Sequence, residues 1–215
     1  MLFDMDGTLV DSEKLWGVAL EDLAVLAGGQ LSTRARLAMV GTSMPVSMAI
    51  FRADLDQPDR PYQADVDWLT DRVAELFADG LTWRPGAREL LHEVRAAGVP
   101  TALVTSTERR LAEVALKTLG AENFDVLVCG DEVARPKPDP EPYLTAAGLL
   151  GVPIGGCVAI EDSPSGVASA VAAGAVVLAV PSDVTLPSTD GIHLRSSLAG
   201  VDLGFLAALG VFGTA

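Results

Sequence analysis

The sequence contains few of the residues on which several kinds of protein depend. Aromatic residues make up 5% of its 215 residues, and it has only two cysteines and two histidines. The histidines lie far from the cysteines in sequence, which excludes the ligand spacing of a zinc centre. Cys129 and Cys157 sit beside strand-like runs, so we expect buried thiols in a reducing compartment and a cytoplasmic protein. His92 is expected on a solvated helix face, and His193 receives no role.

Basic residues and long apolar runs are also scarce. The chain has 15 Lys and Arg against 29 Asp and Glu, a formal net charge of −14. This balance disfavours nucleic acid or an anionic membrane as a partner, and an anionic substrate would need a local positive site. Gly, Pro or a charged residue interrupts every apolar run before it reaches membrane-spanning length. No basic segment followed by an apolar stretch precedes the first motif, so we expect no signal peptide.

The chain does contain enough apolar residues for a sizeable core. Hydrophobic residues make up 49% of the sequence, which excludes disorder and suits one large domain or a domain with an inserted lobe. From residue 98 to 180, apolar strand-like runs alternate with helical patterns. The pattern predicts an α/β fold with a Rossmann-like, doubly wound parallel sheet that is covered on both faces. The predicted strands in this stretch are 100–104, 125–128, 157–160 and 176–180. The helix after 157–160 is predicted to begin with Ser163 as N-cap and Pro164 at its first position.

The stretch that follows the first strand breaks this alternation. Its apolar residues repeat at helical spacing, and no strand signal interrupts them. Helices are predicted near 16–26, 48–55 and 66–77, with linkers at 41–43 and 57–61. We therefore predict a helical cap domain at residues 12–80, inserted into a catalytic core formed by residues 1–11 and 81–215.

Two aspartates stand at the end of the first apolar run. Asp4 and Asp6 are two positions apart, so on an extended segment their side chains would point the same way. Two carboxylates a few ångströms apart repel by about 4 kcal/mol at an effective dielectric constant of about 20. The fold must offset this with a cation or a lysine, or keep one carboxyl protonated. One carboxylate could then attack covalently while the other shuttles a proton; the alternative is an acidic surface turn.

Further polar groups follow the later predicted strands. In a doubly wound sheet such groups gather at the carboxyl ends of the strands. The candidates are Thr105, Ser106, Lys137, Glu161 and Asp162. Taken singly, each has a plain structural alternative: the hydroxyls could cap the next helix, the lysine could be solvated, and the carboxylates could serve the positive end of a helix.

Taken together with the two N-terminal aspartates, these groups predict a phosphate-transfer site. Asp4 would be the nucleophile and Asp6 the general acid and base. Thr105 and Ser106 would bind phosphate oxygens, and Lys137 would neutralise both Asp4 and the phosphoryl group. Asp162, with Glu161, would hold Mg²⁺, which favours oxygen ligands.

These segments resemble the motifs of the haloacid dehalogenase superfamily of aspartate-nucleophile phosphohydrolases. The matching segments are Asp4-Met5-Asp6-Gly7-Thr8, Val104-Thr105-Ser106, Arg135-Pro136-Lys137-Pro138 and Ile160-Glu161-Asp162-Ser163. The resemblance covers nearly the whole chain and points to the subgroup with a helical cap, which contains β-phosphoglucomutase and phosphoglycolate-type phosphatases. It implies an aspartyl-phosphate on Asp4, and Mg²⁺ held by Asp4, the backbone carbonyl of Asp6 and Asp162. It also implies a mobile cap that excludes water and chooses the substrate.

The chain departs from the family pattern in two places. Only residues 1–3 precede Asp4, which is short for a central strand and leads to the hypothesis of a truncated N-terminus. Trp16 and Met44 stand where the mutase branch carries His and Arg, which disfavours mutase activity. Dehalogenases of the superfamily lack the second acidic residue, so the presence of Asp6 argues against dehalogenation.

The sequence thus predicts a monomeric, Mg²⁺-dependent phosphatase that acts on a small phosphorylated metabolite. A sugar-phosphate mutase is the enzymatic alternative. A phospho-accepting signalling module is the non-enzymatic one, although a receiver domain carries its acceptor in mid-chain and has no large helical insert. Trp16, Met44 and Arg52 are the candidates for contact with the substrate.

Overall fold

A computed structural model describes residues 1–181 and 191–209. Within these residues six parallel strands form one sheet in the order β3-β2-β1-β4-β5-β6. The strands are β1 (Leu2–Phe3), β2 (Ala102–Val104), β3 (Val126–Val128), β4 (Val158–Glu161), β5 (Val176–Ala179) and β6 (Ile192–Leu194). The order reverses on either side of β1, as in doubly wound sheets, so the predicted fold class is confirmed. Residues 182–190 and 210–215 of the predicted core lie outside the described part.

Helices cover both faces of the sheet. They are α5 (Ala87–Ala96), α6 (Arg109–Leu119), α7 (Glu141–Leu150) and α8 (Pro164–Ala173). Because successive strand residues point to opposite faces, Phe3 joins the apolar cluster with α5 and α6, whereas Leu2 joins the cluster with α7 and α8. Both side chains are fully buried. Although β1 is only two residues long, it is therefore a central strand enclosed from both sides.

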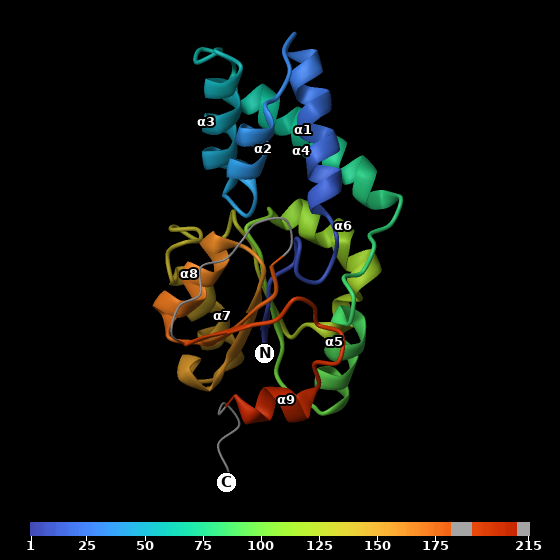
Figure 1. Cartoon of the computed structure of the whole chain (residues 1–215), viewed down its shortest axis with the longest axis vertical. Helices are drawn as coiled ribbons and strands as arrows, with labels where there is room; N and C mark the ends of the chain where they lie inside the picture. The colour runs from blue at the N-terminus through green and yellow to red at the C-terminus, as the bar shows by residue number, and fades with distance from the viewer. Residues whose placement is uncertain (182–190, 210–215) are drawn as a thin grey trace.

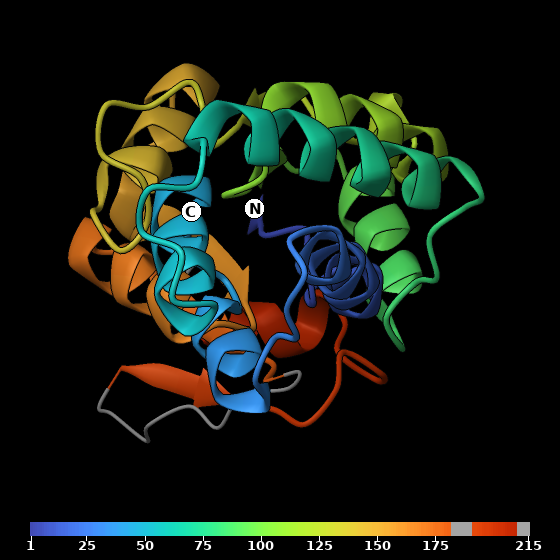
Figure 2. The same ribbon diagram turned by 90° about the horizontal axis from the view of Figure 1, so that it is seen from above.

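Four further helices lie between β1 and β2 in the chain. They are α1 (Glu13–Leu26), α2 (Thr33–Met39), α3 (Met44–Asp54) and α4 (Tyr62–Ala78). They stand together at one end of the sheet, and Figure 1 and Figure 2 show them from the side and from above. Helix α2 was not predicted as a separate element. It buries only Ala35 and Met39, too few residues for a visible period, and its start is set by the Ser32 side chain, which accepts a bond from the N–H of Ala35.

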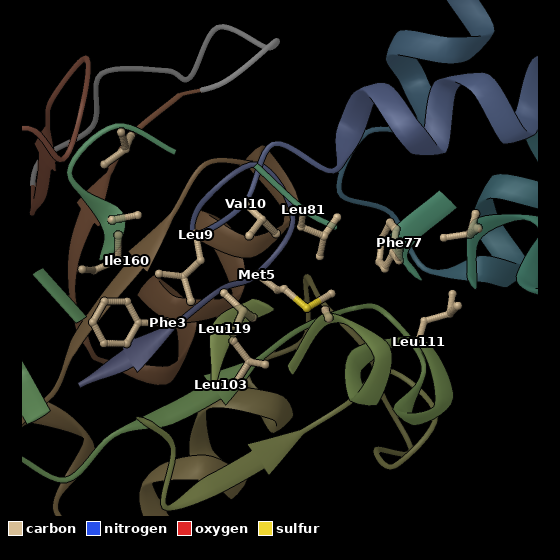
Figure 3. Packing of buried hydrophobic residues seen from close by; sticks show 14 of the residues in the cluster. Phe3, Met5, Leu9, Val10, Phe77, Leu81, Leu103, Leu111, Leu119 and Ile160 are labelled. Carbon is tan, nitrogen blue, oxygen red and sulfur yellow. The ribbon is translucent and has the colours of Figure 1, made fainter. Parts of the chain in front are cut away.

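The helical insert joins the core through two paired segments. The N–H of Asp11 donates to the carbonyl of Thr82 (2.8 Å), and the N–H of Arg84 donates to that of Leu9 (2.9 Å). Buried apolar side chains from both parts pack around this junction, with Met5, Leu9 and Val10 near Leu81 and Phe77 (Figure 3). Because these side chains form one continuous cluster, the start of the insert packs directly against the residues that follow β1.

Two elements near the C-terminal end were not predicted. Strand β6 pairs with β5 at the sheet edge, and its three residues are only partly covered, so no buried apolar run marks it. His193 lies exposed within it, and His92 is exposed on α5, as expected. Helix α9 (Leu203–Ala208) begins where the Asp202 carboxylate accepts a bond from the N–H of Phe205 (2.7 Å).

Two compositional expectations bear on the described residues. Cys129 and Cys157 are free, buried thiols, as predicted. Burial raises the pKa of the Cys129 thiol to about 12, so it remains protonated at neutral pH. No helix within residues 1–181 and 191–209 is both long and apolar enough to span a membrane.

Candidate active site

The predicted polar groups meet at the carboxyl ends of the central strands. Lys137, from the loop before α7, places its Nζ atom 2.7 Å from Oδ1 of Asp4 and 2.6 Å from Oε1 of Glu161. The same ammonium donates to the carbonyl of Val104 (2.9 Å), which ends β2. Lys137 is therefore not solvated, and each of its three protons has a buried acceptor. Burial lowers the pKa of Lys137, but the Asp4 and Glu161 carboxylates raise it overall, so it stays charged.

The two carboxylate oxygens of Asp4 lie in different surroundings. Its Oδ1 accepts from Lys137, whereas its Oδ2 is buried and has no hydrogen-bond partner among the described residues. Burial and the neighbouring Glu161 carboxylate raise the pKa of Asp4 well above its usual value, and Lys137 opposes them. An open, buried carboxylate oxygen needs a partner to offset its lost hydration, and a substrate or a cation would serve.

Glu161 has both of its oxygens occupied. Oε1 accepts from Lys137 and from the Tyr143 hydroxyl (2.7 Å), and Oε2 accepts from the N–H groups of Asp162 and Ser163 and from the Ser163 hydroxyl. A Cβ atom on Gly166 would lie 1.8 Å from this carboxylate, so only glycine leaves it room. Sequence analysis missed Tyr143, because a tyrosine on the apolar face of a helix gives the same pattern as an ordinary core residue.

Asp6 faces a different set of groups from Asp4. Its Oδ1 accepts from the Ser12 hydroxyl (2.6 Å) and from the indole Nε1 of Trp16 (3.2 Å). Its Oδ2 accepts from the hydroxyls of Thr105 (3.3 Å) and Thr107 (2.7 Å). Both aspartates line one pocket, but they lie in separate hydrogen-bond networks, because strand geometry ends at Phe3, before either aspartate.

The three residues that follow β2 differ in whether they line the pocket. Ser106 and Thr107 line the pocket, whereas Thr105 is buried behind them, where its hydroxyl also accepts from the N–H of Thr107 (3.0 Å). Thr107 was not predicted to take part in the site. Its position two residues after Thr105 was the available signal, because alternate residues of an extended segment share a side.

The far wall of the pocket comes from the helical insert. Its side chains include Glu13, Trp16, Arg36, Thr42, Met44 and Ser47. Two of the three predicted substrate contacts, Trp16 and Met44, are thus in the pocket wall. Arg52 is not among the lining residues: its guanidinium lies over the ring of Tyr62, 5.4 Å from the ring centre.

The insert also approaches the core closely beside this pocket. Gly41, in the turn between α2 and α3, has a φ angle of +67°, and a Cβ atom there would lie 2.4 Å from Cβ of Ser163. Ser163 is the N-cap of α8, as predicted, and its side chain accepts a bond from the N–H of Gly166. The Gly41 turn therefore closes the pocket against the core with no room for a methyl group.

This arrangement can be compared with known proteins. A family model described as haloacid dehalogenase-like hydrolase matches residues 1–180. The chain belongs to this family. The resemblance drawn from the four motif segments is thereby confirmed.

Relatives of this haloacid dehalogenase-like hydrolase include enzymes named as phosphatases. Hexitol phosphatase A of Escherichia coli (strain K12) is 36% identical over 208 residues, covering 90% of this chain and 88% of its own. The phosphorylated carbohydrates phosphatase of Thermotoga maritima is 35% identical, covering 81% of each chain. The crystal structure of CbbY from Rhodobacter sphaeroides in complex with phosphate superposes with a TM-score of 0.85 at 30% identity, over 96% of this chain and 97% of that one.

The residues of this haloacid dehalogenase-like hydrolase fit a divalent cation. Asp4, Glu161 and Asp162 each offer a carboxylate oxygen, and these oxygens all lie within 4.8 Å of one another. One of the Asp4 oxygens is the buried atom without a described partner. Lys137 offsets only part of the negative charge of the three carboxylates. A small cation that prefers oxygen ligands, such as Mg²⁺, matches both the donor atoms and the charge.

Proposed function

We propose that this protein is a Mg²⁺-dependent phosphatase that hydrolyses a small phosphorylated metabolite through an aspartyl-phosphate intermediate on Asp4. The observation that carries the proposal is the state of Asp4, which lines the pocket: one of its oxygens is held by Lys137, and the other is buried without a hydrogen-bond partner among the described residues. A carboxylate that is desolvated on one side and oriented by a buried ammonium suits nucleophilic attack. The phosphatases named among the relatives support the same reaction class.

In this mechanism Asp4 bonds to phosphorus as the ester P–O bond breaks. The leaving oxygen takes a proton from Asp6, and the alcohol departs. A water molecule then gives its proton to Asp6 and attacks the aspartyl-phosphate, so inorganic phosphate leaves and Asp4 is restored. Ser106, which lines the pocket, would bind phosphoryl oxygens together with nearby N–H groups, and Lys137 would neutralise the charge that collects on them. Thr105, which the sequence analysis placed with Ser106, would instead hold Asp6 through its hydroxyl.

We propose that Asp4, Asp162 and the backbone carbonyl of Asp6 hold the metal. When bound, Mg²⁺ supplies positive charge that draws the anionic ester to the carboxylates. Glu161, which the sequence analysis placed with the ligands, already accepts bonds from five donors. We therefore propose that Glu161 holds Lys137 in place and does not coordinate the metal.

We propose that residues 12–80 act as a cap that excludes water and selects the substrate. The pocket wall of this segment combines the charged groups of Glu13 and Arg36 with the hydroxyls of Thr42 and Ser47. Such groups exchange hydrogen bonds readily with the hydroxyls of a sugar or polyol. A phosphorylated sugar or polyol is thus the substrate class that the pocket supports, and the hexitol and carbohydrate phosphatases among the relatives agree with it.

The test is phosphate release from a panel of sugar and polyol phosphates by the purified protein with Mg²⁺. Repeated turnover, with inorganic phosphate and the free alcohol as products, supports the proposal. A single stoichiometric phosphorylation without turnover would support the signalling module instead. With β-glucose 1-phosphate we expect inorganic phosphate as the product, because apolar Met44 and the donor-only indole of Trp16 can form few hydrogen bonds with a sugar intermediate. Accumulation of glucose 6-phosphate with a bisphosphate primer would support the mutase.

A further inference from the structure

Trp16 lines the pocket and also donates a hydrogen bond to Asp6. Its indole Nε1 lies 3.2 Å from Oδ1 of Asp6, and its ring meets that of Phe77 edge to face, with centroids 6.3 Å apart. Phe77 is buried in α4, so two helices of the insert, α1 and α4, seat the tryptophan over Asp6. A tryptophan that only filled the pocket wall would leave its N–H to solvent or to substrate.

The four donors around Asp6 come from two sides. Thr105 and Thr107 reach Oδ2 from the core, whereas Ser12 and Trp16 reach Oδ1 from the start of the insert. Three of these donors are hydroxyls, which rotate and can donate or accept. The indole N–H is donor only and its direction is set by a packed ring. Of the four contacts, the one from Trp16 therefore defines most strictly how the carboxyl group lies.

We propose that Trp16 is a positioning residue that orients the Asp6 carboxyl group for proton transfer. Because Trp16 belongs to α1, this orientation depends on how α1 packs against the core. The proposal rests on the proposed phosphatase function, in which Asp6 protonates the leaving oxygen. Proton transfer requires the acid to lie within hydrogen-bond reach of that oxygen, so a carboxyl that rotates freely loses catalytic efficiency. When α1 sits over the core, Trp16 holds Oδ1 and leaves Oδ2, among adaptable hydroxyls, as the oxygen that exchanges the proton.

The test is Trp16→Phe, which keeps an aromatic ring and removes the N–H. Its matched control is Trp68→Phe, which removes an indole N–H from α4 at a half-buried position outside the pocket lining. The value of kcat/KM is measured for a series from an alkyl phosphate, whose leaving group needs the proton, to 4-nitrophenyl phosphate, whose leaving group does not. We expect the alkyl-to-aryl ratio of kcat/KM to fall about tenfold in Trp16→Phe and to stay unchanged in Trp68→Phe.

This ratio is taken on one preparation, so it does not depend on the fraction of folded enzyme. An unchanged ratio in Trp16→Phe would overturn the proposal, because loss of packing slows both ends of the series alike. A raised ratio would overturn it too, because loss of stacking on the substrate slows the aryl end more than the alkyl end. In an Asp6→Asn background, Trp16→Phe should leave the dependence of kcat/KM on the aryl leaving group unaltered, because no acid remains to be oriented. A further change in this dependence would also overturn the proposal. Failure of the proposed function is distinct: the unmodified protein would then release no phosphate from any member of the series.

Discussion

The ammonium of Lys137 lies 2.7 Å from Oδ1 of Asp4, and the two side chains are 2% and 8% exposed. Breaking a buried pair by removing one partner leaves an uncompensated charge and usually costs about 3–5 kcal/mol. Here the pair is part of a triad, because Lys137 also contacts the fully buried Glu161 at 2.6 Å. The triad lets the chemistry of Asp4 be removed without leaving the lysine unpaired.

For that reason Asp4→Asn should abolish turnover and leave the fold intact. Asparagine keeps the volume of the side chain, and Lys137 retains Glu161, so we expect no loss of thermal stability. Phosphate release should fall by at least about 10³-fold, because an amide cannot serve as the nucleophile. The exposed Asp71→Asn on α4 is the control and should keep its activity. Steady-state phosphate release by a folded Asp4→Asn protein would falsify the covalent mechanism.

Removal of the metal should also abolish activity. Three carboxylates lie close to one another and one lysine pairs with only two of them, so an anionic ester meets excess negative charge unless a cation is bound. We expect EDTA to stop phosphate release and Mg²⁺ to restore it. Without substrate, Mg²⁺ at about 100 times its Kd should raise the free energy of unfolding by about 2.7 kcal/mol. This gain should shrink in Asp162→Asn and persist in the exposed Glu75→Gln; full activity in EDTA would contradict the metal site.

Alanine variants at two glycines with similar φ angles can distinguish the effect of pocket closure from the effect of backbone strain. Gly41 and Gly28 have φ angles of +67° and +75°, so alanine is strained at either position. At Gly41 the new Cβ would also collide with Ser163, whereas at Gly28 nothing lies within 4 Å. We expect Gly28→Ala to lose about 1 kcal/mol of stability from backbone strain alone, and Gly41→Ala to lose more because the collision adds to the strain. Only Gly41→Ala should lower kcat/KM, and equal kinetic losses in the two variants would show that closure at Gly41 is unimportant.

The buried Cys129 thiol should make the fold sensitive to alkaline pH. Burial, opposed in part by Arg109, raises its pKa from 9.0 to about 12. Between about pH 9 and 10 the unfolded chain loses this proton and the folded chain keeps it, so the free energy of unfolding falls as pH rises. Denaturant titrations at the two pH values should show a larger fall for the unmodified protein than for Cys129→Ala. Equal falls would mean that Cys129 ionises as readily in the folded chain as in the unfolded one.

Local patterns were enough to predict the class of the fold. The apolar runs of β2, β4 and β5 and the helical periods between them depend on neighbouring residues, which the sequence states directly. The start of α8 is a case in point, because Ser163 as N-cap and Pro164 at the first helical position are local signals and both were confirmed. The same reasoning missed α2 and β6, whose few buried residues make no period.

The contacts of the site were decided by tertiary structure. Lys137 is 133 positions from Asp4, and Tyr143 reaches Glu161 only because α7 packs against the sheet. Sequence spacing placed Asp4 and Asp6 on one side of an extended segment, but β1 ends at Phe3 and the two carboxylates lie in separate hydrogen-bond networks. The sequence by itself determined which chemical groups follow which strand. How near those groups lie to one another depends on the packing of loops and helices that are distant in the chain, and the tertiary structure alone sets those distances.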